Sequence, residues 1–127
     1  MSKILIAEDD KFLSNAYRVK LAKEGFETKL VGSGSELLDT LKTYTPDLII
    51  LDLVMPNKDG FESLKEIKQH EDWKSIPVII VSNLGQKGDI EQGVKLGAVG
   101  YFVKTDSQFK LSNLVQKIKQ LTSGDLL

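Results

Sequence analysis

Residues 46–60 have the sequence PDLIILDLVMPNKDG, and this stretch decides how the chain folds. Its centre, Leu48–Leu51, is a short and continuous apolar run that is followed at once by Asp52. A run of this kind predicts a strand whose two faces are both covered, as in a parallel sheet with helices on each side. Pro56 then favours a turn, so Asp52 is expected at the carboxyl end of the strand.

Further strands and helices alternate on both sides of this stretch. Apolar patterning predicts strands over Lys3–Ala7, Glu27–Val31, Val78–Val81 and Tyr101–Val103. Helical spacing and terminal signals predict helices over Lys11–Glu24, from Ser33 onward, and over Phe61–Gln69, Asp89–Leu96 and Ser107–Leu121. The pairs Ser33/Glu36 and Asp59/Glu62 have the spacing of capping boxes. Gly25 stands where a left-handed cap would end the first helix.

This alternation predicts an α/β fold with one doubly wound, five-stranded parallel sheet. Right-handed crossovers favour the strand order 2-1-3-4-5. In that order the first and third strands flank the point where the connections diverge, and a crevice opens there at the carboxyl ends of the strands. Function is therefore expected in the residues that follow the strands.

Length and composition narrow the class of protein. With 127 residues, the chain is expected to form a single domain over residues 1–127. Its 17 basic and 18 acidic side chains nearly cancel, without the basic excess typical of direct nucleic-acid binding. The absence of cysteine excludes disulfides and thiolate zinc sites and fits a reducing compartment. The apolar runs are too short for a signal peptide or a membrane span, so we expect a cytoplasmic protein.

Polar side chains follow four of the predicted strands. They are Glu8-Asp9-Asp10, Asp52, Ser82 and Lys104. Clustered carboxylates repel one another and favour a cation between them, and oxygen ligands without His or Cys favour Mg²⁺ over zinc. An aspartate beside such a metal can act as a nucleophile towards a phosphoryl group. Lys104 is expected to pair with Asp52 when no such group is bound.

Each of these residues also has an ordinary structural explanation. The acidic triplet Glu8-Asp9-Asp10 favours the start of a helix on charge alone. Asp52 and Ser82 are common turn residues, and Lys104 by itself resembles a surface lysine. What favours a functional site is that all of them are predicted at one edge of one sheet.

With these residues in place, the chain resembles the response-regulator receiver family over nearly its whole length. The segments that carry the resemblance are ILIAEDD (4–10), PDLIILDLVMPNKDG (46–60), IPVIIVS (76–82) and GAVGYFVK (97–104). The resemblance implies a flavodoxin-like fold of five βα units. It also implies a switch that catalyses its own phosphorylation and dephosphorylation and is not otherwise an enzyme.

The resemblance also implies a role for each site residue. The metal, Mg²⁺ with Mn²⁺ as the alternative, would be held by Asp9 directly, by Glu8 through water, by Asp52 and by the backbone carbonyl of Val54. Asp10 is not counted as a ligand. Asp52 would accept the phosphoryl group, assisted by the catalytic side chains Lys104 and Ser82. Ser82 and Tyr101 would form the conformational switch.

The partners that the resemblance implies are a sensor histidine kinase or histidine phosphotransfer protein, or a small phosphodonor, and a downstream output protein or domain. The signal would pass through the face made by the fourth helix, fifth strand and fifth helix, with phosphorylation-linked dimerisation as an option. No direct nucleic-acid or membrane contact is expected. Because the chain ends at Leu127, it is either a stand-alone receiver or a piece of a longer regulator. The kinase, the pathway and the output are not named by the sequence.

Two other functions compete with this reading. A protein-interaction module of the same fold would lack phosphorylation, but such modules usually lack an acid, the acceptor or the lysine. A metal-dependent phosphatase with an aspartate nucleophile would typically carry a second acid at the position of Val54. Two residues also depart from the family pattern: Thr105 replaces the usual proline after Lys104, and Asn83 replaces a small residue after Ser82.

Overall fold

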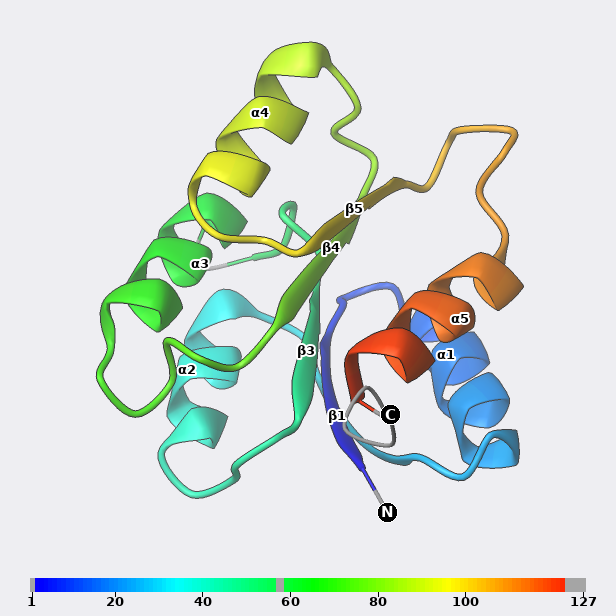
Figure 1. The fold of residues 1–127 in the computed structure, drawn as a ribbon, viewed down its shortest axis with the longest axis horizontal. Helices are drawn as coiled ribbons and strands as arrows, with labels where there is room; N and C mark the ends of the chain where they lie inside the picture. The colour runs from blue at the N-terminus through cyan, green and yellow to red at the C-terminus, as the bar shows by residue number, and fades with distance from the viewer. Residues whose placement is uncertain (1, 57–58, 123–127) are drawn as a thin grey trace.

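Five parallel strands form one sheet in the order 2-1-3-4-5, which confirms the predicted fold class. Figure 1 labels the first, third, fourth and fifth of these strands. The computed structural model describes residues 2–56 and 59–122, so the two ends of the predicted 1–127 domain lie outside the described residues. The strands are β1 (Lys3–Ala7), β2 (Glu27–Val31), β3 (Leu48–Leu51), β4 (Val78–Ser82) and β5 (Gly100–Val103). β1 pairs with both β2 and β3, which places the switch point between β1 and β3.

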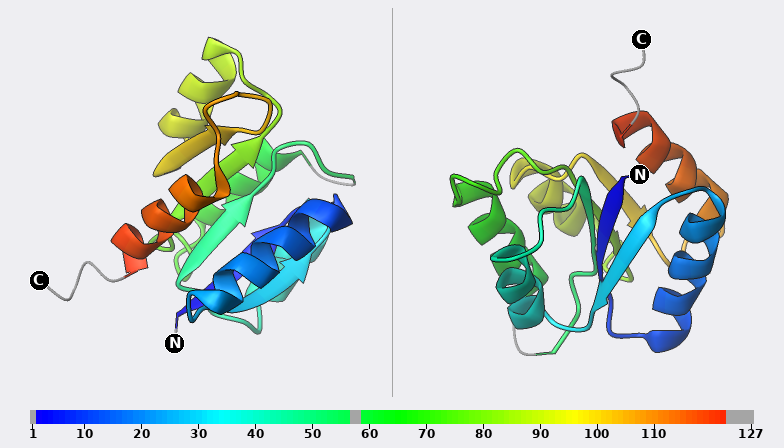
Figure 2. Two further views of the ribbon diagram at one scale, coloured as in Figure 1. Left: turned by 90° about the vertical axis from the view of Figure 1, so that its right-hand side faces the viewer. Right: turned by 90° about the horizontal axis from the view of Figure 1, so that it is seen from below.

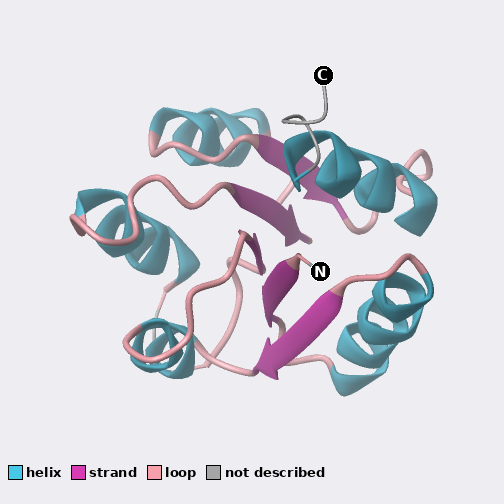
Figure 3. Ribbon diagram, turned by 60° about the horizontal axis from the view of Figure 1, so that its bottom comes forward, coloured by secondary structure: helices cyan, strands magenta, loops and turns pink. Residues whose placement is uncertain are grey.

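Helices cover both faces of the sheet (Figures 2 and 3). One face carries α1 (Lys11–Lys23) and α5 (Leu111–Thr122). The other face carries α2 (Gly34–Leu41), α3 (Gly60–Gln69) and α4 (Lys87–Lys95). No helix in the described part of the chain is long and apolar enough to cross a membrane.

The apolar runs of the strands provide side chains to the hydrophobic cores on both faces of the sheet. In β3, Ile49 and Leu51 face the cluster under α2 and α3, whereas Leu48 and Ile50 face the cluster under α1 and α5. Successive side chains of a strand point to opposite faces, so a strand buried on both sides needs an unbroken apolar run. The run Leu48–Leu51 forms the middle strand of the sheet and is fully buried.

Local signals set several helix ends as predicted. Gly25 follows α1 with a φ of 90°, a conformation that glycine adopts without steric cost. The Ser33 side chain accepts a hydrogen bond from the Glu36 N–H at 3.1 Å, which is half of the predicted capping box. The other half differs, because the Glu36 carboxylate accepts from the Gly32 N–H instead. Asp59 caps α3 through the Phe61 N–H.

Two predicted helix starts were wrong. α5 begins at Leu111 and not at Ser107, because Asp106 stabilises a separate turn first. Its carboxylate accepts from the Gln108 N–H at 2.9 Å, and its carbonyl accepts from the Phe109 N–H at 3.0 Å. α4 begins at Lys87, two residues before the predicted Asp89, whose carboxylate accepts from the Gln86 N–H.

Candidate functional site

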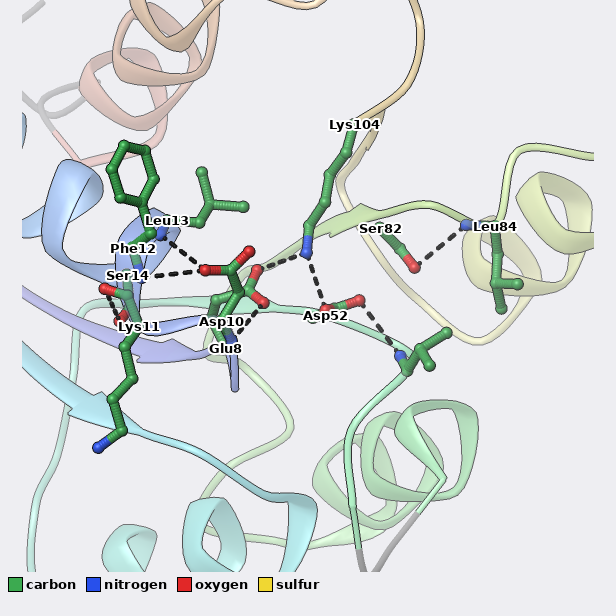
Figure 4. Close-up of polar contacts among 11 residues, drawn as sticks. Glu8, Asp10, Lys11, Phe12, Leu13, Ser14, Asp52, Ser82, Leu84 and Lys104 are labelled. Carbon is green, nitrogen blue, oxygen red and sulfur yellow. Dashed lines mark hydrogen bonds and ion pairs between the residues drawn. The ribbon is translucent and has the colours of Figure 1, made fainter.

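The carboxyl ends of β1, β3, β4 and β5 meet at one edge of the sheet, and the predicted polar residues lie there (Figure 4). Glu8, Asp52 and Ser82 are buried, with 4%, 4% and 0% of their surface exposed. Asp9 is exposed beside them. A buried carboxylate needs a partner, because an unpaired charge in an apolar surrounding is costly.

Lys104 supplies that partner to two carboxylates at once. Its Nζ atom lies 2.7 Å from Oε1 of Glu8 and 2.9 Å from Oδ2 of Asp52, and its side chain is 14% exposed. Figure 4 shows the ammonium group between the two acids. The pairing with Asp52 was predicted, whereas the pairing with Glu8 was not. No local sequence signal could have found it, since the Glu8–Lys104 contact joins the ends of two strands, β1 and β5, that do not pair with each other in the sheet.

Three carboxylates gather closely enough to hold one cation. One oxygen from each of Glu8, Asp9 and Asp52 lies within 4.8 Å of the others. The donor set is made only of oxygen atoms, which suits Mg²⁺ or Mn²⁺. Among the described ion pairs, Lys104 contacts Glu8 and Asp52, and Asp9 adds a third carboxylate, so with Glu8 ionised the cluster has negative charge available to a divalent ion.

The pKa values reflect this crowding. Burial raises the pKa of Glu8 to about 7, and the charge of Asp52 adds to the rise, although the hydrogen bond from Lys104 opposes it. Burial by itself would lower the pKa of Lys104, but hydrogen bonds to Glu8 and Asp52 more than offset this and raise it. Lys104 is therefore a permanent cation at this edge, and Glu8 changes charge near neutral pH.

Asp10 has the ordinary structural role that was considered for the whole acidic triplet. Its side chain accepts from the N–H groups of Phe12 and Leu13 at 3.0 and 3.2 Å, which caps α1. The Asp10 N–H in turn donates to Oε2 of Glu8 at 3.2 Å. Helix capping therefore explains Asp10 and does not explain Glu8.

Both carboxylate oxygens of Asp52 accept hydrogen bonds. Oδ2 meets Lys104, and Oδ1 accepts from the Val54 N–H at 3.2 Å. The role of the Val54 carbonyl as a metal ligand stays a prediction. The backbone N–H of Lys104 donates to the Ser82 carbonyl at 2.9 Å, so the end of β5 stays paired although Thr105 replaces the usual proline. Both Thr105 and Asn83 are exposed.

Ser82 is linked to Tyr101 through the peptide groups of Leu84. The Ser82 hydroxyl accepts from the Leu84 N–H at 3.3 Å, and the Tyr101 hydroxyl donates to the Leu84 carbonyl at 2.5 Å. Burial raises the pKa of Tyr101 to about 12, with nearby Asp89 and Asp52 adding to the rise, so its hydroxyl stays a donor. The sequence predicted Ser82 and Tyr101 but not their link through the backbone of Leu84, because a backbone contact leaves no residue-type signal.

Taken together, the fold and this edge define a small doubly wound α/β domain with a metal-compatible acidic crevice at its switch point. A model of the response regulator receiver domain matches residues 4–119. The chain therefore belongs to the response-regulator receiver family, whose members act in two-component signalling.

Individual relatives agree. The chain is 37% identical over 118 residues to response regulator RR06 of Streptococcus pneumoniae, covering 93% of this chain and 52% of that protein. It is similar to the receiver domain of a signal transduction histidine kinase from Syntrophus aciditrophicus, with a TM-score of 0.88, 31% identity, and 98% and 92% of the two chains covered. The chain spans about half the length of the first curated relatives it matches.

A third relative bears on the metal. The Mn²⁺-bound form of response regulator Rcp1 matches with a TM-score of 0.83 and 30% identity, covering 94% of this chain and 93% of that one. A receiver of this fold therefore binds a divalent ion, and this chain carries an acidic cluster that fits one.

Proposed function

We propose that this chain is a phosphorylation switch in which Asp52 accepts a phosphoryl group in the presence of Mg²⁺. The observation that carries the proposal is the Lys104 ammonium, which lies between Glu8 and Asp52 while Asp9 completes the acidic cluster. A site built only to stabilise the fold would not need a third carboxylate beside the two that pair with Lys104.

The residues divide the work of the transfer. Asp52 attacks phosphorus, so that a new O–P bond forms as the N–P bond of a phosphohistidine breaks and the imidazole leaves with the electron pair. Mg²⁺, held by Glu8, Asp9 and Asp52, would neutralise charge on the phosphoryl oxygens. The N–H of Val54 already donates to Asp52 and orients the attacking carboxylate.

Two side chains are placed to respond once the group is attached. Lys104 loses its carboxylate partner on Asp52 and moves its ammonium to a phosphoryl oxygen. Ser82 turns its hydroxyl from the Leu84 N–H to a phosphoryl oxygen, which releases the loop after β4. The loss of that contact would also affect Tyr101, because the Tyr101 hydroxyl donates to the carbonyl of the same residue, Leu84.

The proposed phosphodonor is a sensor histidine kinase, a histidine phosphotransfer protein or a small phosphodonor. The proposed output surface is made by α4, β5 and α5 and serves a downstream protein or an attached domain. Membership of the receiver family supports these partners, and the nearly balanced charge of the chain gives no reason to propose direct nucleic-acid binding.

Intact-mass analysis after incubation with acetyl phosphate and Mg²⁺ tests the proposal. The parent should gain the mass of one phosphoryl group, and Asp52→Asn should gain none because the nucleophile is gone. Asp39→Asn is the matched control, since Asp39 is exposed on α2 and pairs only with Lys42 among the described salt bridges. Labelling of Asp52→Asn at the parental level would show that another residue is the acceptor.

The same experiment separates the competing functions. A parent that takes no phosphoryl group with either Mg²⁺ or Mn²⁺ would favour the protein-interaction module of the same fold. Continuous release of phosphate from many equivalents of donor, without a lasting adduct, would favour the phosphatase. The apolar Val54 makes the phosphatase the weaker alternative, because it provides no second acid near the nucleophile.

A further inference from the structure

The middle of α4 lies unusually close to the ring of Tyr101. Gly93 is the buried residue of α4, a helix whose residues are all described. A Cβ atom added to Gly93 would lie 3.1 and 3.2 Å from two ring carbons of Tyr101 and 2.7 Å from Cδ1 of Ile80. A real side chain at position 93 would therefore push against the ring, against Ile80 or against both.

The place of the Tyr101 ring is determined from two directions. Its hydroxyl donates to the Leu84 carbonyl, and its ring lies against the bare Cα of Gly93. The Leu84 N–H in turn donates to Ser82, at the end of β4. A ring displaced from Gly93 could not keep the short contact with the Leu84 carbonyl.

Glycine is an unfavourable choice for this helix on local grounds. In a helix interior it is less stable than alanine, because it loses more backbone entropy on folding. Gly93 is in the second half of α4 and has no left-handed conformation to explain it. Gly88, in the first turn of the same helix, has no atom within 4 Å of the place a Cβ would take. Close approach to the Tyr101 ring and to Ile80 distinguishes Gly93 from Gly88.

We propose that Gly93 is a positioning residue for Tyr101: its missing side chain lets the ring rest on α4 with its hydroxyl bound to the Leu84 carbonyl. Only the consequence for signalling rests on the proposed function. The packing relationship between Gly93 and Tyr101 stands independently of it.

Two alanine variants in one helix test the proposal. Gly88→Ala should raise the midpoint of thermal unfolding, or leave it unchanged, and should leave the Tyr101 signals in place. Gly93→Ala should lower the midpoint of thermal unfolding. It should also shift the NMR resonances of the Tyr101 ring, measured in ring-labelled protein and assigned by comparison with Tyr101→Phe. If Gly93→Ala instead raises the midpoint as helix propensity alone requires, and the Tyr101 signals do not move, the proposal is wrong.

A double variant, Gly93→Ala with Tyr101→Leu, shows whether a loss of stability in Gly93→Ala comes from the Tyr101 ring. In a Tyr101→Leu background the ring is gone, so Gly93→Ala should cost much less stability than it does in the parent. An unchanged cost would assign the strain to Ile80 and would overturn the role given to Tyr101.

The signalling consequence has its own measurement. Gly93→Ala should still take up one phosphoryl group from acetyl phosphate. Its amide shifts at α4 and β5 should differ from those of the parent before labelling and should change by a different amount on labelling. Equal changes in parent and variant would contradict the consequence for signalling. A parent that takes no phosphoryl group would defeat the proposed function but leave the alanine and double-variant results interpretable.

Discussion

Glu8 combines deep burial with a raised pKa. It is buried, it lies near Asp52, and it still has a pKa of about 7 although Lys104 donates a hydrogen bond to it. Such a group is kept partly protonated by its surroundings until a cation replaces the proton. Its behaviour with pH should therefore report directly on metal binding.

We expect the apparent affinity for Mg²⁺ to rise as pH increases towards 7 and to level off above it. Below pH 7, Mg²⁺ must displace a proton from Glu8, which lowers the affinity by up to about tenfold per pH unit. Titration calorimetry at several pH values measures this. Glu8→Gln should bind more weakly but with much less dependence on pH in this range. A parental pH profile in Glu8→Gln would show that another group titrates.

The lifetime of phosphorylated Asp52 is expected to depend on Val54. Hydrolysis needs a water in line with the breaking bond, and the Val54 side chain offers no hydrogen bond to hold one. Val54 is 55% exposed, whereas Leu84, the other apolar residue predicted to exclude water, packs half-buried against the α2–α3 cluster. We therefore predict that phosphorylated Asp52 is long-lived, and that Val54 contributes more than Leu84 to its slow hydrolysis.

The measurement is the rate of phosphate loss from the parent, Val54→Asn, and Val54→Asn combined with Leu84→Glu. Polar side chains at these positions should speed hydrolysis by about ten- to hundredfold, equivalent to roughly 1.4–2.7 kcal/mol of barrier. Equal rates in all three proteins would show that Val54 and Leu84 do not slow the hydrolysis of phosphorylated Asp52.

At the scale of the helices, short polar contacts decide where elements begin. Asp10 caps the start of α1 directly after the clustered acids Glu8 and Asp9, and Asp106 makes a turn that precedes α5, which begins at Leu111. In the second case, apolar periodicity pointed to a longer helix, but an Asp side chain bonding its own backbone two residues ahead competes with helix formation. Element ends therefore follow local polar chemistry more closely than the apolar stripe.

Replacing Asp10 by Ala should separate helix capping from chemistry. The variant loses the acceptor for the N–H groups of Phe12 and Leu13, which should lower the free energy of unfolding by about 1 kcal/mol. Phosphorylation by acetyl phosphate should persist, because Glu8, Asp9 and Asp52 remain. Urea denaturation and intact mass measure the two effects. Unchanged stability with lost labelling would place Asp10 in the metal site instead.

At the scale of the whole molecule, ionisation of Glu8 opposes folding, because burial favours its protonated form. Because the pKa of folded Glu8 is raised above the ordinary value of 4.5, the folded state holds its proton more tightly than the unfolded chain. The stability contributed by that proton is present below pH 4.5 and is lost as pH rises through about 7. A cation should restore stability in the pH range where the proton is lost.

Thermal unfolding with and without Mg²⁺ tests this coupling. At a concentration 100 times its dissociation constant, Mg²⁺ should add about 2.7 kcal/mol to the free energy of unfolding. If that concentration is chosen from the dissociation constant at pH 8 and then kept constant, the gain should be smaller at pH 5.5, and it should be mostly absent in Asp9→Asn. An equal gain in Asp9→Asn would indicate that Mg²⁺ acts elsewhere on the chain.

The amino-acid sequence by itself determined the fold class, the strand order and the set of residues at the functional edge. The apolar run Leu48–Leu51 requires cover on both faces, and parallel strands bring residues such as Asp52 and Lys104 to one side. These features are local or periodic along the chain, so they can be recognised without coordinates. Only the tertiary structure decided which groups touch. The sharing of Lys104 with Glu8, the Leu84 link and the contact of Gly93 with the Tyr101 ring depend on distances of a few ångströms, which are set when separate strands and helices pack.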